Sequence, residues 1–187
     1  ANLVLHRYIP EANKRIQHTA HWFDHPHPGG RSLDGECDFA ALKLCRASYL
    51  FRNSSELEKG TRESIEKFFL IQDFKSKYGS EHHELMFRVS RYLMAQLLPD
   101  KIFKAYGGKG EYFKGEDAKW LKDFIRFRAK QGWGEFDSSC YYGTDLEILL
   151  TLFDYAEDSE LRHLTEMMLD LLMADISVDS LKGMYCG

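Results

Sequence analysis

The sequence has little of what marks disulfide-rich, zinc-knuckle or nucleic-acid-binding proteins. Its four cysteines form no CxxC pair, so we expect buried free thiols rather than zinc or redox motifs. The net charge of −4 does not suggest the basic surface that nucleic acid requires. No apolar run is long enough to span a bilayer, and no signal-peptide pattern opens the chain. We therefore expect neither a nucleic-acid nor a membrane partner.

The alternation of apolar and polar residues that is typical of half-buried strands is also missing. Apolar residues instead recur at spacings of three and four, which predicts an all-α fold. Aromatic residues make up 14% of the chain and charged residues 29%, as in a globular domain. The expected helices cover roughly residues 10–24, 38–52, 62–74, 83–98, 116–131, 145–156 and 159–176.

Two pairs of these helices, in residues 39–70 and 146–173, share one layout. Each pair has an apolar helix that ends in an aromatic residue, a polar turn containing Ser-Glu-Leu, and an amphipathic helix. This pattern suits a double layer with the more apolar helices inside. Repeated antiparallel hairpins predict a solenoid or a closed α/α toroid. We expect one domain over residues 1–187, a partial or short (α/α) toroid that is part of a longer chain.

A histidine-rich stretch follows the first expected helix. His18, His21 and His25 have spacings that place them on one helix face, with His27 nearby. Imidazole is a good zinc ligand, so a zinc site is one interpretation. However, Pro26 ends the helix directly after His25, and no HExxH motif is present. We favour packing of these side chains over a metal site, and we expect no cofactor.

Two histidines stand at the start of a strongly periodic helix, in the stretch Ser80-Glu81-His82-His83-Glu84. A histidine where a loop enters a helix can exchange protons near neutral pH. The helix N-terminus favours its neutral form, whereas the neighbouring glutamates act in the opposite direction. The alternative is that Ser80 caps the helix, the glutamates complement its dipole and the histidines are merely solvated.

The loop at residues 131–145 combines glycines with four aromatic residues and two acids that fall within ten residues, 133–142. Aromatic rings on such a loop suit stacking against sugar rings, and a tyrosine hydroxyl there could protonate a leaving oxygen. The alternative is that the rings fill the junction between helices while Thr144 or Asp145 caps the next helix. The residues concerned are Trp133, Glu135, Phe136, Asp137, Tyr141 and Tyr142.

The segments GWGEFDSSCYYGTD, with the helices that follow it to residue 183, and SEHHELMFRVSRYLMAQLLPD at residues 80–100 carry a resemblance. Together they resemble the α/α-toroid domain of bacterial polysaccharide lyases of the heparinase II/III-like and alginate-lyase-like groups. The resemblance covers roughly residues 35–187. It implies a secreted or periplasmic protein that acts on an acidic polysaccharide or oligosaccharide.

In such lyases an Asn-His pair opens an inner helix, and a tyrosine lies across the cleft. The resemblance implies that His83 corresponds to this histidine and Tyr141 or Tyr142 to the tyrosine. His82 stands in place of the asparagine that helps to neutralise the uronate carboxylate, a role that a protonated His82 could take. The implied reaction is β-elimination, in which stabilisation of the developing enolate is the largest contribution. Substrate contacts are expected from Glu81, Arg88, Trp133 and Glu135.

Two other functions remain open from the sequence. A glycoside hydrolase on the same scaffold would use two carboxylates, for which Glu135 and Asp137 are the local candidates. A non-catalytic helical domain would use the same aromatic loop to bind a glycan or a partner protein. Fold analogy alone does not choose among them.

Overall fold

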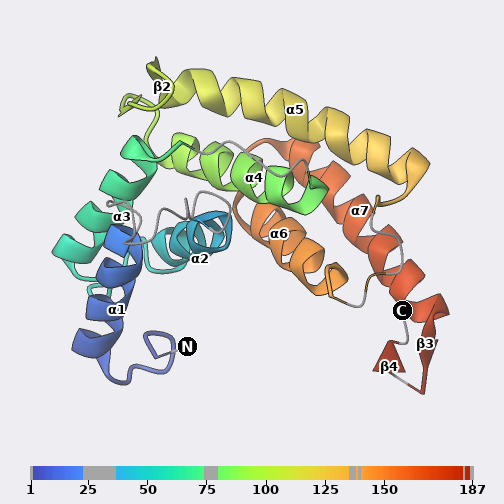
Figure 1. The fold of residues 1–187 in the computed structure, drawn as a ribbon, viewed down its shortest axis with the longest axis horizontal. Coiled ribbons are helices and arrows are strands. Elements are labelled where there is room, and N and C mark those ends of the chain that lie inside the picture. Colours follow the sequence, from blue (N-terminus) through green and yellow to red (C-terminus); the bar gives the residue numbers. More distant parts are fainter. Residues whose placement is uncertain are drawn as a thin grey trace, which may run out of the picture.

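The computed structural model describes residues 2–22, 37–73, 80–134, 138, 140–182 and 184–185. Within these residues the chain forms seven helices, so the expected all-α class is confirmed (Figure 1). Each expected helix has its counterpart. The helices are α1 (Ile9–Trp22), α2 (Cys37–Leu50), α3 (Lys59–Ile71), α4 (Glu81–Leu97), α5 (Gly110–Gln131), α6 (Tyr142–Tyr155) and α7 (Ser159–Val178).

Two short antiparallel pairs of strands accompany the helices. Strands β1 (Ile102–Phe103) and β2 (Gly108–Lys109) join α4 to α5, and β3 (Ser180–Leu181) pairs with β4 (Met184–Tyr185) after α7. The sequence did not predict them, because two residues are too few to show an alternating pattern. None of the described helices is long and apolar enough to cross a bilayer.

Helices α2, α4 and α6 run in the same direction. At their N-terminal ends, Asp38 of α2 is hydrogen-bonded to His83 of α4. At their C-terminal ends, the Tyr49 hydroxyl donates to the Leu93 carbonyl over 2.7 Å, and the Tyr49 ring stacks on Tyr155 at 4.7 Å. The residues that begin these three helices therefore meet at one end of the molecule.

Helix α4 forms the centre of the core. Figure 1 shows it between α5 on one side and α2 and α6 on the other. Its side chains are buried around almost the whole circumference, and each buried large apolar side chain contributes about 1.5–3 kcal/mol relative to exposure. Gln96, near its C-terminal end, donates to the Tyr49 hydroxyl and the Tyr155 carbonyl at 2.8 and 2.9 Å. It also accepts from the Glu157 backbone at 2.9 Å, so this polar side chain ties three helices together.

The two hairpins with similar sequences have different neighbours. Helix α7 packs along α6 and α5, whereas α3 packs mainly on α1. Asn13 of α1 anchors the turn before α3, because its side chain donates to the Glu56 carbonyl at 2.7 Å and accepts from the Glu58 backbone at 3.0 Å. The first hairpin is thus built with α1 as a third member.

Helix α5 begins six residues earlier than the expected boundary at residue 116. Glycines at 110 and 115 have poor intrinsic helix propensity, which hides this start in the sequence. The contact with the end of α4 explains Gly110. A Cβ atom at this position would lie 2.2 Å from the Leu98 carbonyl oxygen, so a side chain does not fit.

The cysteine prediction is confirmed for two residues. Cys37 and Cys45 are buried and form no disulfide, whereas Cys140 is exposed, so the expectation of burial is wrong for this residue. Cys186 lies outside the described residues.

Candidate functional site

The candidate site lies where the N-terminal ends of α2 and α4 meet the turn before α6. Asp38 comes from the first turn of α2, His82 and His83 from the first turn of α4, and Tyr141 directly precedes α6. Ser80 precedes α4 with extended backbone, but its side chain makes no capping bond to the helix backbone. Its hydroxyl oxygen lies 2.9 Å from Nδ1 of His82 instead. Ser80 thus occupies the N-cap position, but the alternative in which its side chain caps the helix is not what the structure has.

The central contact is the hydrogen bond between Nδ1 of His83 and Oδ2 of Asp38. The Asp38 side chain is fully buried, and its Oδ1 accepts from the Phe39 backbone at 2.8 Å. Burial raises the pKa of Asp38, and the bond from His83 acts in the opposite direction without cancelling it. When the His83 ring is neutral, a proton on Nδ1 leaves the lone pair on Nε2. Asp38 therefore orients the imidazole.

The other histidine packs against a tyrosine. The rings of His82 and Tyr141 stack at 4.1 Å with an interplanar angle of 23°, and the rings of His82 and His83 lie 4.6 Å apart. His82 is 2% exposed, whereas Tyr141 is 36% exposed. Phe39, 41% exposed, meets the His83 ring edge-on at 5.8 Å. Two exposed aromatic rings thus flank the histidine pair.

The two candidate tyrosines differ in their environments. Tyr142 is 2% exposed, and its hydroxyl donates to Oδ2 of Asp175 on α7 at 2.7 Å. This bond joins the start of α6 to the end of α7. Tyr141, one residue earlier, is the tyrosine that the structure places against the histidines.

Glu81 and Trp133 belong to the junction of α4 with the end of α5. Glu81 accepts from the Gly134 backbone at 2.5 Å and pairs with Nη2 of Arg128 at 2.8 Å. Trp133 is 7% exposed and packs edge-on to Phe124 at 6.2 Å. It lines a cavity of about 340 Å³ between α5 and α7. A buried ring in this position does not form the exposed stacking surface that the loop composition suggested.

Arg88 lies deeper along α4 and is bound to acids there. Its Nε donates to Glu84 at 2.8 Å and its Nη1 to Asp117 of α5 at 2.9 Å. Arg91 donates to both oxygens of the same Asp117 at 2.7 and 2.6 Å. Burial alone would lower the pKa of Arg88, but the bonds to Glu84 and Asp117 outweigh it and raise the pKa. These contacts hold α4 on α5 and keep both arginines charged.

The remaining predicted residues lie apart from the histidine pair or outside the described chain. His18 packs on Trp22 at 5.4 Å, and Nε2 of His21 lies 3.2 Å from the Ser64 hydroxyl. In the part of the chain that the structure describes, no group of three or more metal-ligating side chains could hold a metal ion. His25, His27, Glu135, Phe136 and Asp137 lie outside the described residues.

Asp38 is the site residue that sequence reasoning missed. It opens the first apolar helix just as the histidines open the central one. The sequence contained a signal for it, because the helices that begin near residues 38 and 83 were both expected in the inner layer. Neighbouring parallel helices bring their first residues together. Only the packing of α2 on α4 gave Asp38 a partner.

No protein-family model matches the chain, and no curated protein or solved structure matches it either.

Proposed function

We propose that the start of α4, with Asp38 and Tyr141, is the acid–base site of a protein that cleaves an acidic polysaccharide by β-elimination. The observation that carries this proposal is the bond from His83 to the buried Asp38 beside a partly exposed tyrosine. A histidine oriented by a buried carboxylate is suited to take a proton, because the carboxylate stabilises the imidazolium that forms.

The proposed reaction assigns each proton. Nε2 of His83 takes the proton from C5 of a uronate residue. The C5–H electron pair becomes the C4–C5 double bond as the C4–O bond breaks. The Tyr141 hydroxyl gives its proton to the departing glycosidic oxygen. His82, when protonated, lies next to His83 and would offset the negative charge of the uronate carboxylate.

The proposal includes a partial (α/α) toroid fold like that of polysaccharide lyases and a secreted or periplasmic location. The parallel course of α2, α4 and α6 is what the inner layer of a partial (α/α) toroid requires, and it supports the likeness to polysaccharide lyases. A protein with such a substrate would work in a secreted or periplasmic setting. Arg88 and Trp133 play no part in this proposal, since their contacts are with α5 and its neighbours.

A second candidate, glycan binding without cleavage, has its own support. Phe39 and Tyr141 are exposed aromatic rings on either side of the histidine pair, and pyranose faces stack on such rings. This arrangement would bind a sugar chain even if no proton were transferred.

The experiment is to incubate the protein with a panel of uronic-acid polysaccharides and to follow the ultraviolet absorbance of the unsaturated product. We expect absorbance to rise, and His83→Ala and Tyr141→Phe to slow it by about a hundredfold or more. Reducing ends without absorbance would support hydrolysis instead. Retention on immobilised polysaccharide without either product would support binding alone, and unchanged turnover of His83→Ala would exclude His83 as the base.

A further inference from the structure

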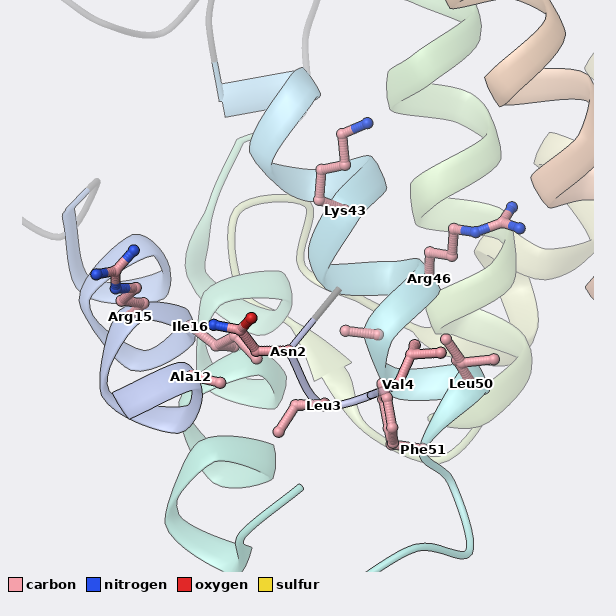
Figure 2. Close-up of a pocket in the computed structure, with 11 residues that line it drawn as sticks. Asn2, Leu3, Val4, Ala12, Arg15, Ile16, Lys43, Arg46, Leu50 and Phe51 are labelled. Carbon is pink, nitrogen blue, oxygen red and sulfur yellow. The ribbon is translucent and has the colours of Figure 1, made fainter. Parts of the chain in front are cut away.

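A second candidate site lies on another part of α2, more than one helical turn from Asp38. The segment at residues 2–4 lines an open cavity of about 410 Å³ together with α1 and α2 (Figure 2). This volume falls within the range of small-molecule sites, about 300–1,000 Å³. Its lining consists of Asn2, Leu3, Val4, Ala12, Arg15, Ile16, Lys43, Arg46, Ala47, Leu50 and Phe51.

The wall opposite the helices is a turn that the rest of the structure holds in place. The backbone of Arg7 donates to the Asn2 carbonyl at 2.9 Å, and that of His6 donates to the Leu3 carbonyl at 3.2 Å. Leu3 is buried, and the His6 ring is hydrogen-bonded to Glu56 beyond α2. His6 and Tyr8 have positive φ values of 52° and 50°, a conformation that persists only where surrounding contacts fix it.

The interior of this cavity is apolar. Ala12 and Ile16 come from α1, and Ala47 and Leu50 come from the facing side of α2. Figure 2 shows the α1 and α2 side chains on opposite sides, with Leu3 and Val4 between them. Water in such a space has few polar groups to bind, so an apolar ligand gains free energy by displacing it.

The rim carries positive charge. Arg15, Lys43 and Arg46 line the cavity, and the lining contains no carboxylate. Each cation has an acidic partner outside the lining: Arg15 pairs with Glu11 at 3.0 Å, Arg46 with Asp154 at 3.3 Å, and Lys43 with Glu147. Arg46 also donates to the Thr151 hydroxyl at 3.0 Å. The pairs of Arg15 and Lys43 are solvent-exposed and weak in water, so a ligand anion can bind Lys43 at little cost. Arg46 is held more firmly and would share its guanidinium between the ligand and its present partners.

We propose that this cavity binds a small amphiphilic anion, an apolar chain or ring that bears one carboxylate. Its apolar body lies against Ile16, Ala47 and Leu50. Its carboxylate reaches the side chains of Lys43 and Arg46, which stand one turn apart on the same face of α2. The site is independent of the acid–base site, because none of its lining residues belongs to that site.

Three probes separate the two features of the ligand. Octanoate has both an apolar chain and a carboxylate, octanol has only the chain and acetate has only the charge. In calorimetric titrations of the whole chain, we expect octanoate to bind at least about tenfold more tightly than either of the others. Equal affinity for octanoate and octanol would overturn the proposal, since the cations would then contribute nothing.

Variants of the lining locate the binding. Lys43→Gln and Arg46→Gln should each weaken octanoate binding by about fivefold, and Lys59→Gln, a fully exposed lysine on α3, should leave it unchanged. Ala47→Phe should abolish binding by filling the cavity while circular dichroism stays that of a folded helical protein. Unchanged affinity in both Lys43→Gln and Arg46→Gln would contradict the proposal even if Ala47→Phe failed to fold. Turnover of polysaccharide is not part of this test, so the two proposals fail separately.

Discussion

The buried carboxylate of Asp38 accepts a hydrogen bond from His83, which is 45 residues away in the sequence. This bond crosses from α2 to α4 and gives a fully buried carboxylate a side-chain hydrogen-bond donor, in addition to backbone donors such as that of Phe39. A carboxylate in this position costs free energy when it ionises, because water cannot solvate it. The pair therefore combines a structural contact with a titrating group.

The titration of Asp38 has a definite sign. Its pKa is raised in the folded protein above the ordinary value of 3.8, so folding favours the protonated form. The stability from this group is complete below pH 3.8 and is lost as the pH rises through the raised pKa. We expect the free energy of unfolding of Asp38→Asn to increase relative to the wild type over that window. Urea denaturation from pH 3 upward measures it, and a variant whose free energy of unfolding falls relative to that of the wild type as the pH rises would contradict the assignment.

The two neighbouring tyrosines should separate stability from activity. Tyr142→Phe removes the bond to Asp175, so it should lower the free energy of unfolding by about 1 kcal/mol and leave elimination unaffected. Tyr141→Phe should do the reverse, because Tyr141 is partly exposed and its hydroxyl is the proposed acid. Denaturation and the absorbance assay on both variants test this. Loss of turnover in Tyr142→Phe at unchanged stability would transfer the proposed acid role to Tyr142.

Asp117 should be among the most sensitive polar residues of the core. Replacing it with alanine leaves the guanidinium groups of Arg88 and Arg91 without their shared carboxylate. We expect a loss of about 3–5 kcal/mol in the free energy of unfolding. Asp123→Ala, at an exposed position on the same helix, should change it by less than about 0.5 kcal/mol. Similar effects of the two substitutions would mean that the buried cluster contributes little.

Two glycines of α5 provide a matched pair. Gly110→Ala places a Cβ atom against the Leu98 carbonyl, so it should destabilise the fold by about 1–3 kcal/mol. Gly115→Ala meets no atom within 4 Å and should stabilise the helix by about 0.5–1 kcal/mol. Thermal unfolding of the two variants is the measurement. A stable Gly110→Ala would show that the end of α4 can move away from α5.

The sequence predicted the helices well where apolar spacing was regular. The central helix α4 was expected at residues 83–98 and lies at Glu81–Leu97, because its large apolar side chains leave little ambiguity. The start of α5 was missed, because Gly110 is explained only by the approach of Leu98. Local patterns do not contain such contacts between distant segments.

The candidate site was predictable only in part, for the same physical reason. The position of His82 and His83 at a helix start was visible in the sequence, but Asp38 became their neighbour through packing. The bond from Arg88 to Asp117 and the burial of Trp133 likewise depend on where α5 lies. Residue type indicated which chemistry was available, and tertiary contacts decided which side chains could take part in it.

Gln96 and Tyr49 fasten the C-terminal ends of α2, α4 and α6 to one another. With this end fixed, any relative displacement of the three helices would be largest at their opposite, N-terminal ends. That end carries the histidine pair, about 20 Å away along α4. A ligand that bridges the starts of these helices would restrict that displacement. Its binding entropy would therefore depend on how firmly Gln96 and Tyr49 hold the C-terminal ends together. Removing the hydrogen bonds of Gln96 would therefore change the affinity for a ligand at the histidine pair, which Gln96 does not contact.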